Sequence, residues 1–393
     1  MKIIAFYLPQ FHSIPENDEW WGKGFTEWTN VKKAKSLFNG HEQPKVPLNN
    51  NYYNLLDDNV KIWQAQLAKK YGIYGFCYYH YWYNGHMLLE KPMEQMLKNK
   101  NVDIPFCIWW CNQPWTKSWV GNDNKVLISQ KYGDKNEWIE HYKYLRQFFL
   151  DKRYILNENK PIIGIYQPAV IEPINEIKEC WVKLAREDGF DGIDLMCTFK
   201  SFNISEKERQ TYKCFNHFVE WSFTLAVDDI VNKSRNTCYT YMKNVKNRLN
   251  EFFKRKTGKD LPISNLISKL KRLVINKGSV TKYDYDVIWN EIIGFKHFSN
   301  KSIPGAIVNW DNTARYGING SVIINSSAYK FEKYLSKQIK NARSKYNSDM
   351  IFLQAWNEWA EWSVLEPDEI NKYDYLQAVK NALIANKEFP NYE

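Results

Sequence analysis

The sequence predicts an α/β protein, a single (β/α)8 TIM-type barrel that spans residues 1–393 and carries a basic helical insertion at about 231–282. Apolar, strand-like segments alternate with helical patterns along the chain, which is typical of a parallel sheet covered on both faces. The length suits one barrel with insertions. No glycine-rich phosphate-binding motif follows a strand, and this argues against an open nucleotide-binding sheet.

Eight segments have the continuous apolar composition of strands buried on both faces, the sixth with the weakest pattern. In chain order they are Lys2–Leu8, Ile73–Tyr79, Pro105–Trp110, Ile162–Tyr166, Gly192–Cys197, Lys213–Val219, Gly305–Asn309 and Met350–Ala355. Between and after them, apolar residues recur at helical spacing. These helical segments are Asp57–Tyr71, Lys91–Lys98, Asn136–Leu150, Glu172–Asp188, Tyr283–Phe295, Ala328–Lys345 and Tyr373–Ala385. Eight such units favour a barrel over an open sheet.

The composition, with 44% hydrophobic residues, suffices for a full core. No apolar run approaches the ~20 residues of a membrane span. Pro9 interrupts the first apolar run and no small-residue cleavage site follows, so we expect a first strand instead of a signal peptide, and a cytoplasmic protein. Several of the seven cysteines lie in apolar runs as core residues. They are Cys77, Cys107, Cys111 and Cys197. No zinc-ligand spacing occurs, so we expect no metal and no cofactor.

The net charge of +10 is concentrated in one segment. Between Val231 and Lys282 there are fourteen Lys and Arg residues but only two acids, Glu251 and Asp260, which gives this segment a charge of +12. The remainder of the chain carries about −2. The body of the protein is therefore not a general polyanion binder, and we expect no nucleic-acid partner.

Within this segment, apolar residues recur at helical spacing and basic residues flank them. The apolar residues are Ile263, Leu266, Ile267, Leu270, Leu273 and Val274. A basic amphipathic helix can lie on an anionic membrane, which predicts peripheral contact with the inner membrane through 231–282. The same apolar stripe can instead dock on the barrel while the charges are solvated. Both interpretations are open on the sequence.

Two carboxylates, Glu358 and Glu361, follow the last expected strand and lie among Trp356, Trp359 and Trp362. Glycosyl chemistry uses such a pair, with one carboxyl group protonated to assist the leaving oxygen and the other ionised. Indole faces offer flat apolar surfaces to sugar C–H groups. The alternative is a helix N-terminus, where Glu is favoured by the macrodipole. The surrounding Trp residues and Asn357 favour a site.

Aromatic residues make up 16% of the chain and cluster after the expected strands. The clusters include Trp20–Trp21, Tyr78–Trp82, Trp109–Trp110, Trp115, Trp119 and Trp310. Interior packing explains any single cluster. The carboxyl ends of barrel strands, however, meet at one face and build the active site there. The recurrence of the clusters at these ends therefore predicts one aromatic pocket around the carboxylates.

Long motifs spread over nearly the whole chain also resemble a known family. The motifs are Ala5–His12, Asn17–Asn30, Gly75–Trp82, Trp310–Thr313, Arg315 with Gly317, Ala355–Glu361 and Leu365–Asp368. They resemble the WbsX family, whose members are encoded among O-antigen and capsule biosynthesis enzymes and are related to glycoside hydrolase family 99. The resemblance implies a (β/α)8 barrel and a glycan substrate, which in this setting can be lipid-linked.

The resemblance also implies roles for the carboxylate pair. Glu358 corresponds to the base that activates the sugar's own 2-hydroxyl, which forms a 1,2-anhydro intermediate. Glu361 corresponds to the acid/base that assists the leaving group and then activates the acceptor, so that configuration is retained. The barrel pattern and the resemblance together give the sugar-contacting candidates of one pocket. They are Tyr7, His12, Glu27, Tyr79, His80, Trp82, Trp110, Asn112, Trp115, Trp310, Asp311 and Asn357.

The chain departs from the family pattern at Gln113, where members often have Glu, and at Trp362, where Gly is usual. These departures keep a non-catalytic glycan-binding barrel as an alternative. A metal-dependent sugar-nucleotide glycosyltransferase is a second alternative, because Asp284 and Asp286 form an Asp-x-Asp motif. The motif begins a helical pattern instead of ending a strand, and we interpret it as a helix start.

Chelation distinguishes the metal-dependent alternative from the two-carboxylate enzyme. We expect full glycosyl turnover after exhaustive EDTA treatment, because two carboxylates suffice for this chemistry. The measurement is product formation before and after chelation, with Mg²⁺ or Mn²⁺ added back to a parallel sample. Activity that is lost to EDTA and restored by either ion would identify the metal-dependent transferase.

Overall fold

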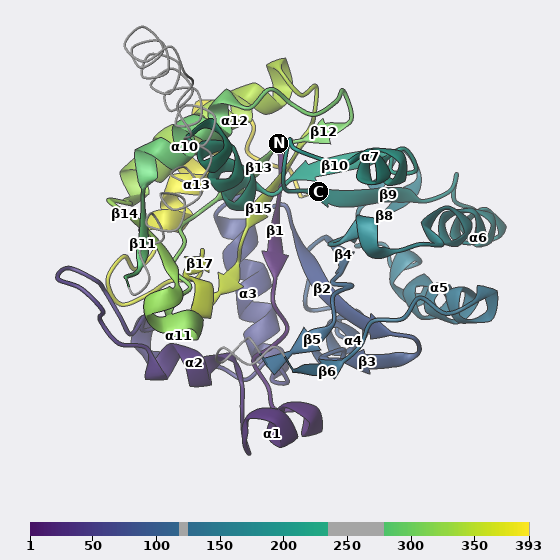
Figure 1. Ribbon diagram of the computed structural model, residues 1–393, viewed down its shortest axis with the longest axis horizontal. Helices are drawn as coiled ribbons and strands as arrows, with labels where there is room; N and C mark the ends of the chain where they lie inside the picture. The colour runs from purple at the N-terminus through teal and green to yellow at the C-terminus, as the bar shows by residue number, and fades with distance from the viewer. Residues whose placement is uncertain (118–124, 235–278, 393) are drawn as a thin grey trace, which may run out of the picture.

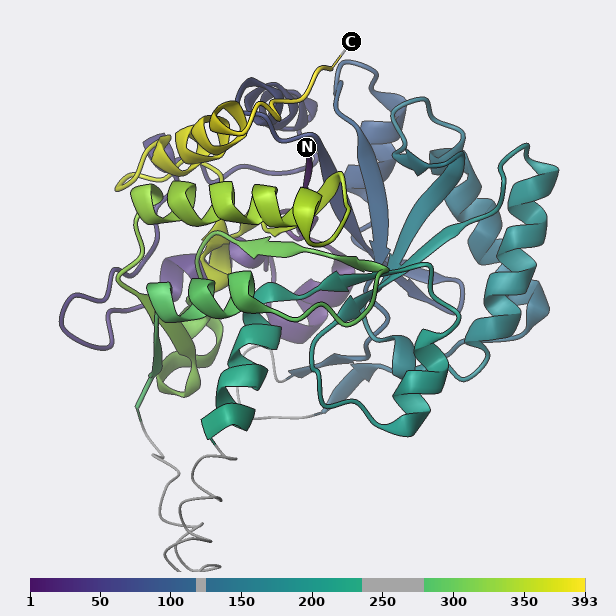
Figure 2. The ribbon, with the colours of Figure 1, turned by 90° about the horizontal axis from the view of Figure 1, so that it is seen from above.

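The structure is a computed structural model and describes residues 1–117, 125–234 and 279–392. Parallel strands occupy the centre of the molecule and helices cover their outer side (Figures 1 and 2). In spatial order the main sheet is β12-β10-β9-β8-β4-β2-β1-β15-β13. In chain order the strands are β1 (Lys2–Tyr7), β2 (Gly75–Tyr83), β4 (Phe106–Trp110), β8 (Lys160–Ile165), β9 (Asp194–Phe199), β10 (His217–Glu220), β12 (Ser302–Ile303), β13 (Gly305–Ile307) and β15 (Met350–Gln354).

The strands at the two ends of this order, β12 and β13, are consecutive in the chain and separated only by Pro304. Strand β12 pairs with β10, and β13 pairs with β15, both in parallel. Phe352 N of β15 donates to Pro304 O (3.2 Å), so pairing continues across the proline. Proline interrupts the ladder because it has no N–H. The strands therefore occupy eight positions, and the sheet closes into the expected barrel.

The expected strand segments are confirmed, including the weak sixth, which corresponds to β10. The expected helices are also confirmed to within a few residues. They are α3 (Asp58–Lys70), α4 (Lys91–Lys98), α5 (Lys135–Phe149), α6 (Ile174–Glu187), α10 (Tyr285–Gly294), α12 (Ala328–Ser344) and α13 (Asp374–Ala385). The sequence did not predict four short helices: α1 (Pro15–Trp21), α2 (Glu27–Lys33), α7 (Glu206–Tyr212) and α11 (Thr313–Tyr316). Helices of one or two turns show too little periodicity to identify.

Short strands and turns of 3-10 helix lie between these elements. The strands are β3 (His86–Leu88), β5 (Trp115–Thr116), β6 (Val126–Ile128), β7 (Leu156–Asn157), β11 (Thr281–Asp284), β14 (Ser321–Ile324), β16 (Asn357–Glu358) and β17 (Ser363–Val364). The 3-10 turns are η1 (Leu48–Asn50), η3 (Pro168–Val170), η4 (Gly317–Asn319) and η5 (Trp359–Glu361). Helix α2, helix α11, β16 and η5 carry the charged residues of the candidate site.

Large aromatic side chains fill the interior of the barrel. The Trp109 ring meets Phe6 edge-on, with ring centroids 5.3 Å apart, and lies 5.5 Å from the ring of Phe352. Gly164 on the neighbouring strand β8 makes room for it, since a Cβ at Gly164 would lie 1.9 Å from the Trp109 ring. This layer forms a solid floor below the carboxyl ends of the strands.

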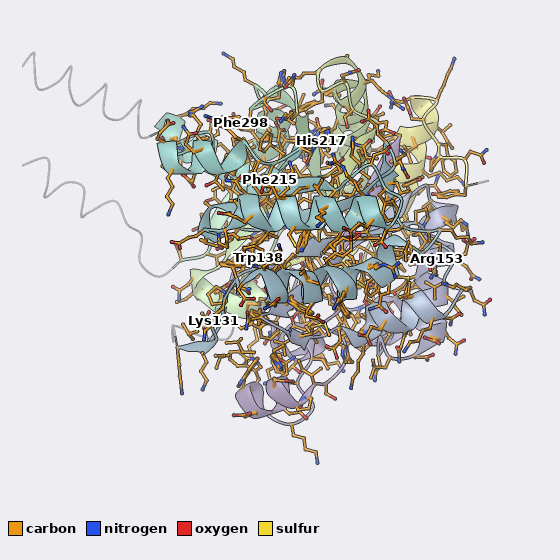
Figure 3. The ribbon with its side chains drawn as sticks, turned by 90° about the vertical axis from the view of Figure 1, so that its right-hand side faces the viewer. Lys131, Trp138, Arg153, Phe215, His217 and Phe298 are labelled. Carbon is orange, nitrogen blue, oxygen red and sulfur yellow. The ribbon has the colours of Figure 1, made fainter. Side chains whose placement is uncertain are left out.

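Helices α5 and α6 lie side by side on the outer side of the barrel (Figure 3). Trp181 Nε1 of α6 donates to Trp138 O near the start of α5 (2.9 Å). Beyond the other end of α5, the Arg153 guanidinium donates to the carbonyls of Val102 (2.7 Å) and Leu97 (3.0 Å). These contacts fix the helical layer against which several of the predicted aromatic residues pack.

The Asp-x-Asp motif starts a helix, as expected, but Asp284 is also the last residue of strand β11, which the sequence did not predict. Asp284 is the N-cap of α10, and its side chain accepts from Asp286 N (2.9 Å). Asp286 pairs with Lys330 (2.7 Å) and accepts from Tyr334 Oη (2.7 Å). Both carboxylates thus have structural partners away from the barrel mouth.

The cysteines that the sequence places in the core, Cys77, Cys107, Cys111 and Cys197, are buried as free thiols. Among the residues that the structure describes, no helix has the length and apolar character needed to cross a membrane. Most of the basic segment, together with its apolar stripe, lies outside the described residues, so the insertion at about 231–282 stays a prediction.

Candidate active site

A cavity of about 480 Å³ opens at the carboxyl ends of the barrel strands. It is lined by Leu8, Tyr79, Tyr81, Cys111, Gln113, Pro114, Thr116, Tyr166, Gln167, Trp221, Thr224, Trp310, Arg315, Tyr316, Gln354, Glu358 and Glu361. The lining combines aromatic rings with amides and charged groups, which is the character of a binding site for a polar ligand with apolar faces. Both predicted catalytic carboxylates are among its lining residues.

Arg315 joins three carboxylates at the edge of this cavity. Its Nη1 donates to Glu361 Oε1 (2.8 Å) and its Nη2 to Glu27 Oε1 (2.5 Å). Glu358 Oε2 lies further away, 3.8 Å from Nη2. The side chains of Arg315, Glu27 and Glu358 are at most 7% exposed, so little water screens this cluster. One guanidinium therefore faces three acidic side chains at a position that is nearly inaccessible to solvent.

The local sequence explains how these residues reach one point. Glu27 begins α2, whose N-cap Thr26 forms a capping box, and its acidic side chain is favoured in the first helical turn. Arg315 is in the last turn of α11, where a basic side chain is favoured. Glu358 ends β16, and Glu361 ends the 3-10 turn η5 that follows directly.

Burial sets the protonation of the pair. The pKa of Glu358 is raised well above its usual value by desolvation and by repulsion from Glu361, while Arg315 and a hydrogen bond from Tyr79 oppose this. The pKa of Glu361 is raised by desolvation, and Arg315 lowers it. Within the pair, only Glu361 contacts the guanidinium directly, so Glu358 holds a proton more strongly than Glu361 does. The two carboxyl groups thus differ in acidity, as a general acid and a base must.

Hydrogen bonds outside the cavity hold the segment that carries Glu358 and Glu361 in place. Asn357 clamps it to the end of β1, because its Oδ1 accepts from Leu8 N (2.7 Å) and its Nδ2 donates to Leu8 O (3.0 Å). Glu366 anchors the tryptophans of the same segment and accepts from Trp356 Nε1 (3.0 Å) and Trp359 Nε1 (2.7 Å). Burial raises the pKa of Glu366 to about 7 although these donors lower it.

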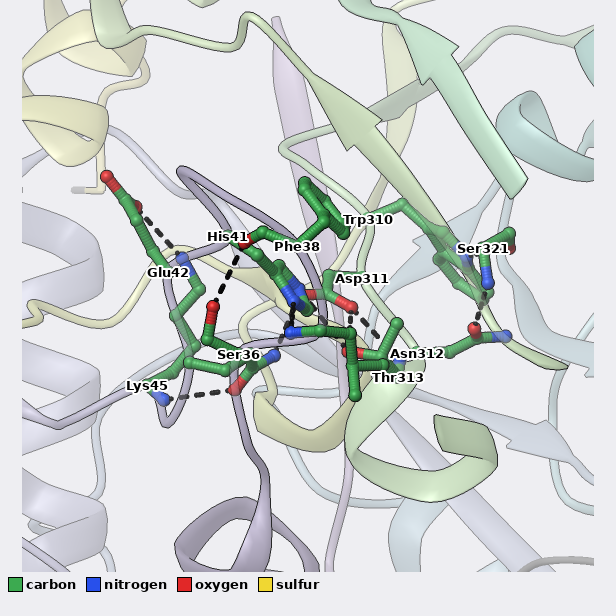
Figure 4. Close-up of polar contacts among 12 residues, drawn as sticks. Ser36, Phe38, His41, Glu42, Lys45, Trp310, Asp311, Asn312, Thr313 and Ser321 are labelled. Carbon is green, nitrogen blue, oxygen red and sulfur yellow. Dashed lines mark hydrogen bonds and ion pairs between the residues drawn. The ribbon is translucent and has the colours of Figure 1, made fainter. Parts of the chain in front are cut away.

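Asp311 supports the pair from outside the cavity, and Figure 4 shows its hydrogen bonds with His41 and Thr313. Its Oδ2 accepts from His41 Nε2 (2.8 Å) and Gln43 Nε2 (2.7 Å). Its Oδ1 accepts from Thr313 N (3.0 Å) and Oγ1 (2.6 Å) at the start of α11. Its own N–H donates to Glu361 O (2.7 Å). Asp311 therefore orients both the helix of Arg315 and the backbone of Glu361, and does not face the cavity.

Of the twelve predicted sugar-contacting residues, Tyr79 and Trp310 line the cavity, and Glu27 reaches its edge through Arg315. Asn357 and Asp311 support the site from behind, as described above. The remaining seven, which the sequence placed in the same pocket, lie elsewhere.

His80, Trp82 and Trp110 point outward from the barrel toward α5. His80 Nε2 lies 3.0 Å from His141 Nε2, and the Trp82 ring stacks on His141 with centroids 4.4 Å apart. Burial lowers the pKa of His80 to about 3. The reason is strand alternation: Tyr79 and Tyr81 point inward, so His80 and Trp82 cannot.

Four more of the predicted residues lie outside the predicted pocket: Tyr7, His12, Asn112 and Trp115. Tyr7 Oη faces α3 and donates to Gln64 Oε1 (2.6 Å). His12 lines a separate cavity beside α2. Asn112 holds the loop after β8, because its Nδ2 donates to Gln167 O (2.8 Å) and its Oδ1 accepts from Gln167 N (2.8 Å). Trp115 packs edge-on against Tyr81, 5.5 Å away, behind the cavity wall.

The sequence reasoning missed Tyr81, Tyr166, Trp221 and Arg315 as site residues. The alternation of side chains along a strand could have identified Tyr81, because it is two residues after Tyr79 and therefore faces the same side of the strand. Arg315 occurs in a motif that carries the family resemblance, but nothing in the sequence assigned it a role. Its partners come from α2 and η5, 288 and 46 residues away in the chain.

In the described ranges, no group of three or more His, Cys, Asp or Glu side chains is arranged to hold a metal ion. The cavity instead presents aromatic rings, amides and a carboxylate pair. This arrangement can bind a sugar and exchange protons with its hydroxyl or glycosidic oxygen.

Comparisons with known proteins agree with this geometry. Residues 3–379 match the family model described as "Glycosyltransferase WbsX". Two curated proteins named "Uncharacterized protein WxcX", from two strains of Xanthomonas campestris pv. campestris, are 31% identical over 386 residues. The match covers 97% of this chain and 49% of each relative, so the chain spans about half the length of these proteins.

Among solved structures, a GH99 endo-alpha-mannosidase from Bacteroides thetaiotaomicron in complex with bis-tris-propane superimposes with a TM-score of 0.57. The alignment covers 98% of this chain and 97% of that one, with 12% identity. A structure described as a "Glycoside hydrolase-like protein" gives a TM-score of 0.54 at 12% identity, over 99% and 94% of the two chains. These likenesses confirm the barrel fold.

Removal of Arg315 tests the charge cluster. In Arg315→Met, three buried carboxylates lose their cation, and we expect the free energy of unfolding to fall by about 3–5 kcal/mol at pH 7.5. The pKa values of Glu358 and Glu361 already lie above their unfolded values, and the substitution raises them further. Protonation then favours the folded state at low pH, and this benefit is lost as pH rises. The defect should therefore be smaller at pH 5 than at pH 8 in urea unfolding.

Arg343→Met is the matched control, because Arg343 pairs with Glu388 on the surface, where its side chain is 47% exposed. The free energy of unfolding of this variant should fall by at most about 1 kcal/mol. An Arg315→Met protein with wild-type stability at pH 8, or with a defect that does not depend on pH, would contradict the buried-cluster interpretation.

Proposed function

The chain belongs to the WbsX glycosyltransferase family, and we propose that it is a carbohydrate-active enzyme that cleaves or transfers glycosyl units in bacterial surface-polysaccharide (O-antigen or capsule) biosynthesis. The observation that carries the proposal is the buried pair Glu358 and Glu361 at the mouth of the barrel, held by one guanidinium beside an aromatic-walled cavity. A non-catalytic binding barrel has no need for such a costly arrangement of buried charge.

The proposed reaction proceeds in two balanced steps. Glu358 takes the proton of the sugar's 2-hydroxyl, whose oxygen attacks C1 while the glycosidic bond breaks and the leaving oxygen takes the proton of Glu361. Glu361 then accepts a proton from water or a glycan hydroxyl, which attacks C1 and opens the 1,2-anhydro ring. The ring oxygen at C2 recovers its proton from Glu358. Two inversions at C1 retain the configuration.

These roles require the proton of the pair to lie on Glu361 when substrate is bound. The deeper burial of Glu358 by itself favours the opposite state. A 2-hydroxyl that donates to Glu358 stabilises its ionised form, and a glycosidic oxygen beside Glu361 accepts from its protonated form. Substrate binding therefore sets the catalytic protonation state, and Tyr79, which bonds Glu358, supports it.

We further propose that the basic segment at about 231–282 brings the enzyme to the cytoplasmic face of an anionic inner membrane, where lipid-linked glycans are assembled. The charge of +12 and the apolar helical stripe support this location. Each Lys or Arg near the surface contributes about 1 kcal/mol toward an anionic bilayer.

The catalytic assignment is tested with the host's lipid-linked repeat unit or polysaccharide as substrate and mass spectrometry of the products. We expect Glu358→Gln and Glu361→Gln each to lower turnover by at least ~10²–10⁴-fold, the contribution of general acid–base catalysis. Glu187→Gln, an exposed change on α6, is the control and should leave turnover unchanged. Near-normal turnover in either active-site variant would refute the assignment.

A glycosyl fluoride substrate distinguishes the base from the acid, because its leaving group needs little acid assistance. Glu361→Gln should retain most of the bond-cleavage step on this substrate, whereas Glu358→Gln should stay inactive. In the wild type, the rate should fall as pH drops and protonates the base, and again as pH rises and ionises the acid. The midpoints of both declines in rate should lie above pH 4.5, because the pKa values of both carboxyl groups are raised.

Vesicle co-sedimentation tests the membrane proposal. Wild-type protein should bind anionic vesicles in low salt and dissociate as salt rises. A variant with Lys254, Arg255, Lys256, Lys269, Lys271 and Arg272 changed to Gln should bind less and keep full turnover on a soluble substrate. Equal binding by both proteins, or binding by neither, would show that the segment is a solvated insertion.

A further inference from the structure

Lys200 occupies an inward position at the barrel mouth that the catalytic site does not use. It follows strand β9, in which Met196 lies opposite the inward-facing Gly164 of β8. Side chains alternate along a strand, so residues 198 and 200 continue the inward row after Met196. By the same parity, Tyr166 after β8 and Trp221 after β10 point inward, and both line the cavity. In the strand order Lys200 therefore lies between Tyr166 and Trp221, which line the cavity, although Lys200 is not itself a lining residue.

The ammonium group of Lys200 lies over the face of the Tyr166 ring, 3.2 Å from its centroid. Within the described ranges, no carboxylate lies within ion-pair distance of this ammonium. Burial lowers the pKa of Lys200 to about 7. A partly buried cation that contacts only an aromatic face is weakly stabilised. A cation–π contact contributes less free energy than a desolvated ion pair with an anion.

The neighbouring wall contains amides and no acid. Gln113 and Gln167 both line the cavity, and Gln167 Nε2 donates to Gln113 Oε1 (3.1 Å), which leaves further N–H donors for a ligand. All three carboxylates of the charge cluster contact Arg315 instead. The wall beside Tyr166 therefore combines amide groups with a cation for which the described residues supply no ion-pair partner, whereas the three carboxylates contact Arg315.

We propose that Lys200, with the amides of Gln113 and Gln167, binds an anionic substituent of the glycan, a carboxylate or a phosphate group, so that the enzyme acts on an acidic polysaccharide. This inference rests on the proposed function and adds the substrate class. An anion placed here satisfies the ammonium and the amide N–H groups. A neutral sugar at this position leaves the cation unpaired.

The test compares matched glycans on the inactive Glu361→Gln protein by titration calorimetry. The probes are uronic-acid oligosaccharides with their carboxyl-reduced forms, and phosphorylated oligosaccharides with their dephosphorylated forms. One acidic class should bind at least ten-fold more tightly than its neutral partner, and which class does so identifies the anion. Lys200→Met in the same background should abolish this preference, and Lys200→Arg should retain it. Lys207→Met, at an exposed lysine of α7, should change nothing.

The pH dependence separates a binding role from a structural one. The preference for the acidic probe should be greater at pH 6 than at pH 8.5, because Lys200 loses its charge as pH rises through its pKa near 7. Equal binding of acidic and neutral probes, or a preference that survives Lys200→Met, would overturn the inference and leave the proposed function intact. Failure to bind any glycan, with no turnover by the wild type, would overturn both.

Discussion

The site depends on one constraint, which is that Arg315 must neutralise three buried acidic side chains from two separate parts of the chain. Glu27 comes from the helix after the first strand, whereas Glu358 and Glu361 follow the last strand. Charges in such a dry environment are costly unless each has a partner. The ion pairs at 2.5 Å to Glu27 and 2.8 Å to Glu361 therefore join the first and last barrel units at the mouth. Loss of the cation would leave every partner uncompensated.

The rest of the structure supplies what this cluster needs. The aromatic layer of Phe6, Trp109 and Phe352 gives it a rigid floor, and Gly164 permits that layer by leaving room for an indole. Hydrogen bonds from Leu8 to Asn357 fix the segment that carries the pair. Rigid support of this kind keeps reactive groups within the narrow geometry that catalysis requires.

The cavity presents two kinds of chemical group, and both fit the proposed reaction. Around Arg315, buried carboxyl groups with raised pKa values provide proton donors and acceptors. Beside Tyr166, the amide N–H groups of Gln113 and Gln167 and the ammonium of Lys200 offer donors and positive charge to a ligand. A substrate with a reactive glycosidic bond at one end and an anionic group nearby would satisfy both regions.

The sequence by itself determined the barrel, its eight strand segments, its long helices and the carboxylate pair, because continuous apolar runs, helical periodicity and a dense local motif are all properties of neighbouring residues. It did not determine which aromatic residues enter the cavity. Strands of a parallel barrel are apolar on both faces, so no polar face marks the inward row, and Tyr79 could not be separated from His80 or Trp82. Nor did it find the role of Arg315, since its partners, 46 and 288 residues away in the chain, meet it only when the barrel closes. Tertiary structure decided both, because closure fixes the strand parity and brings the first and last units together.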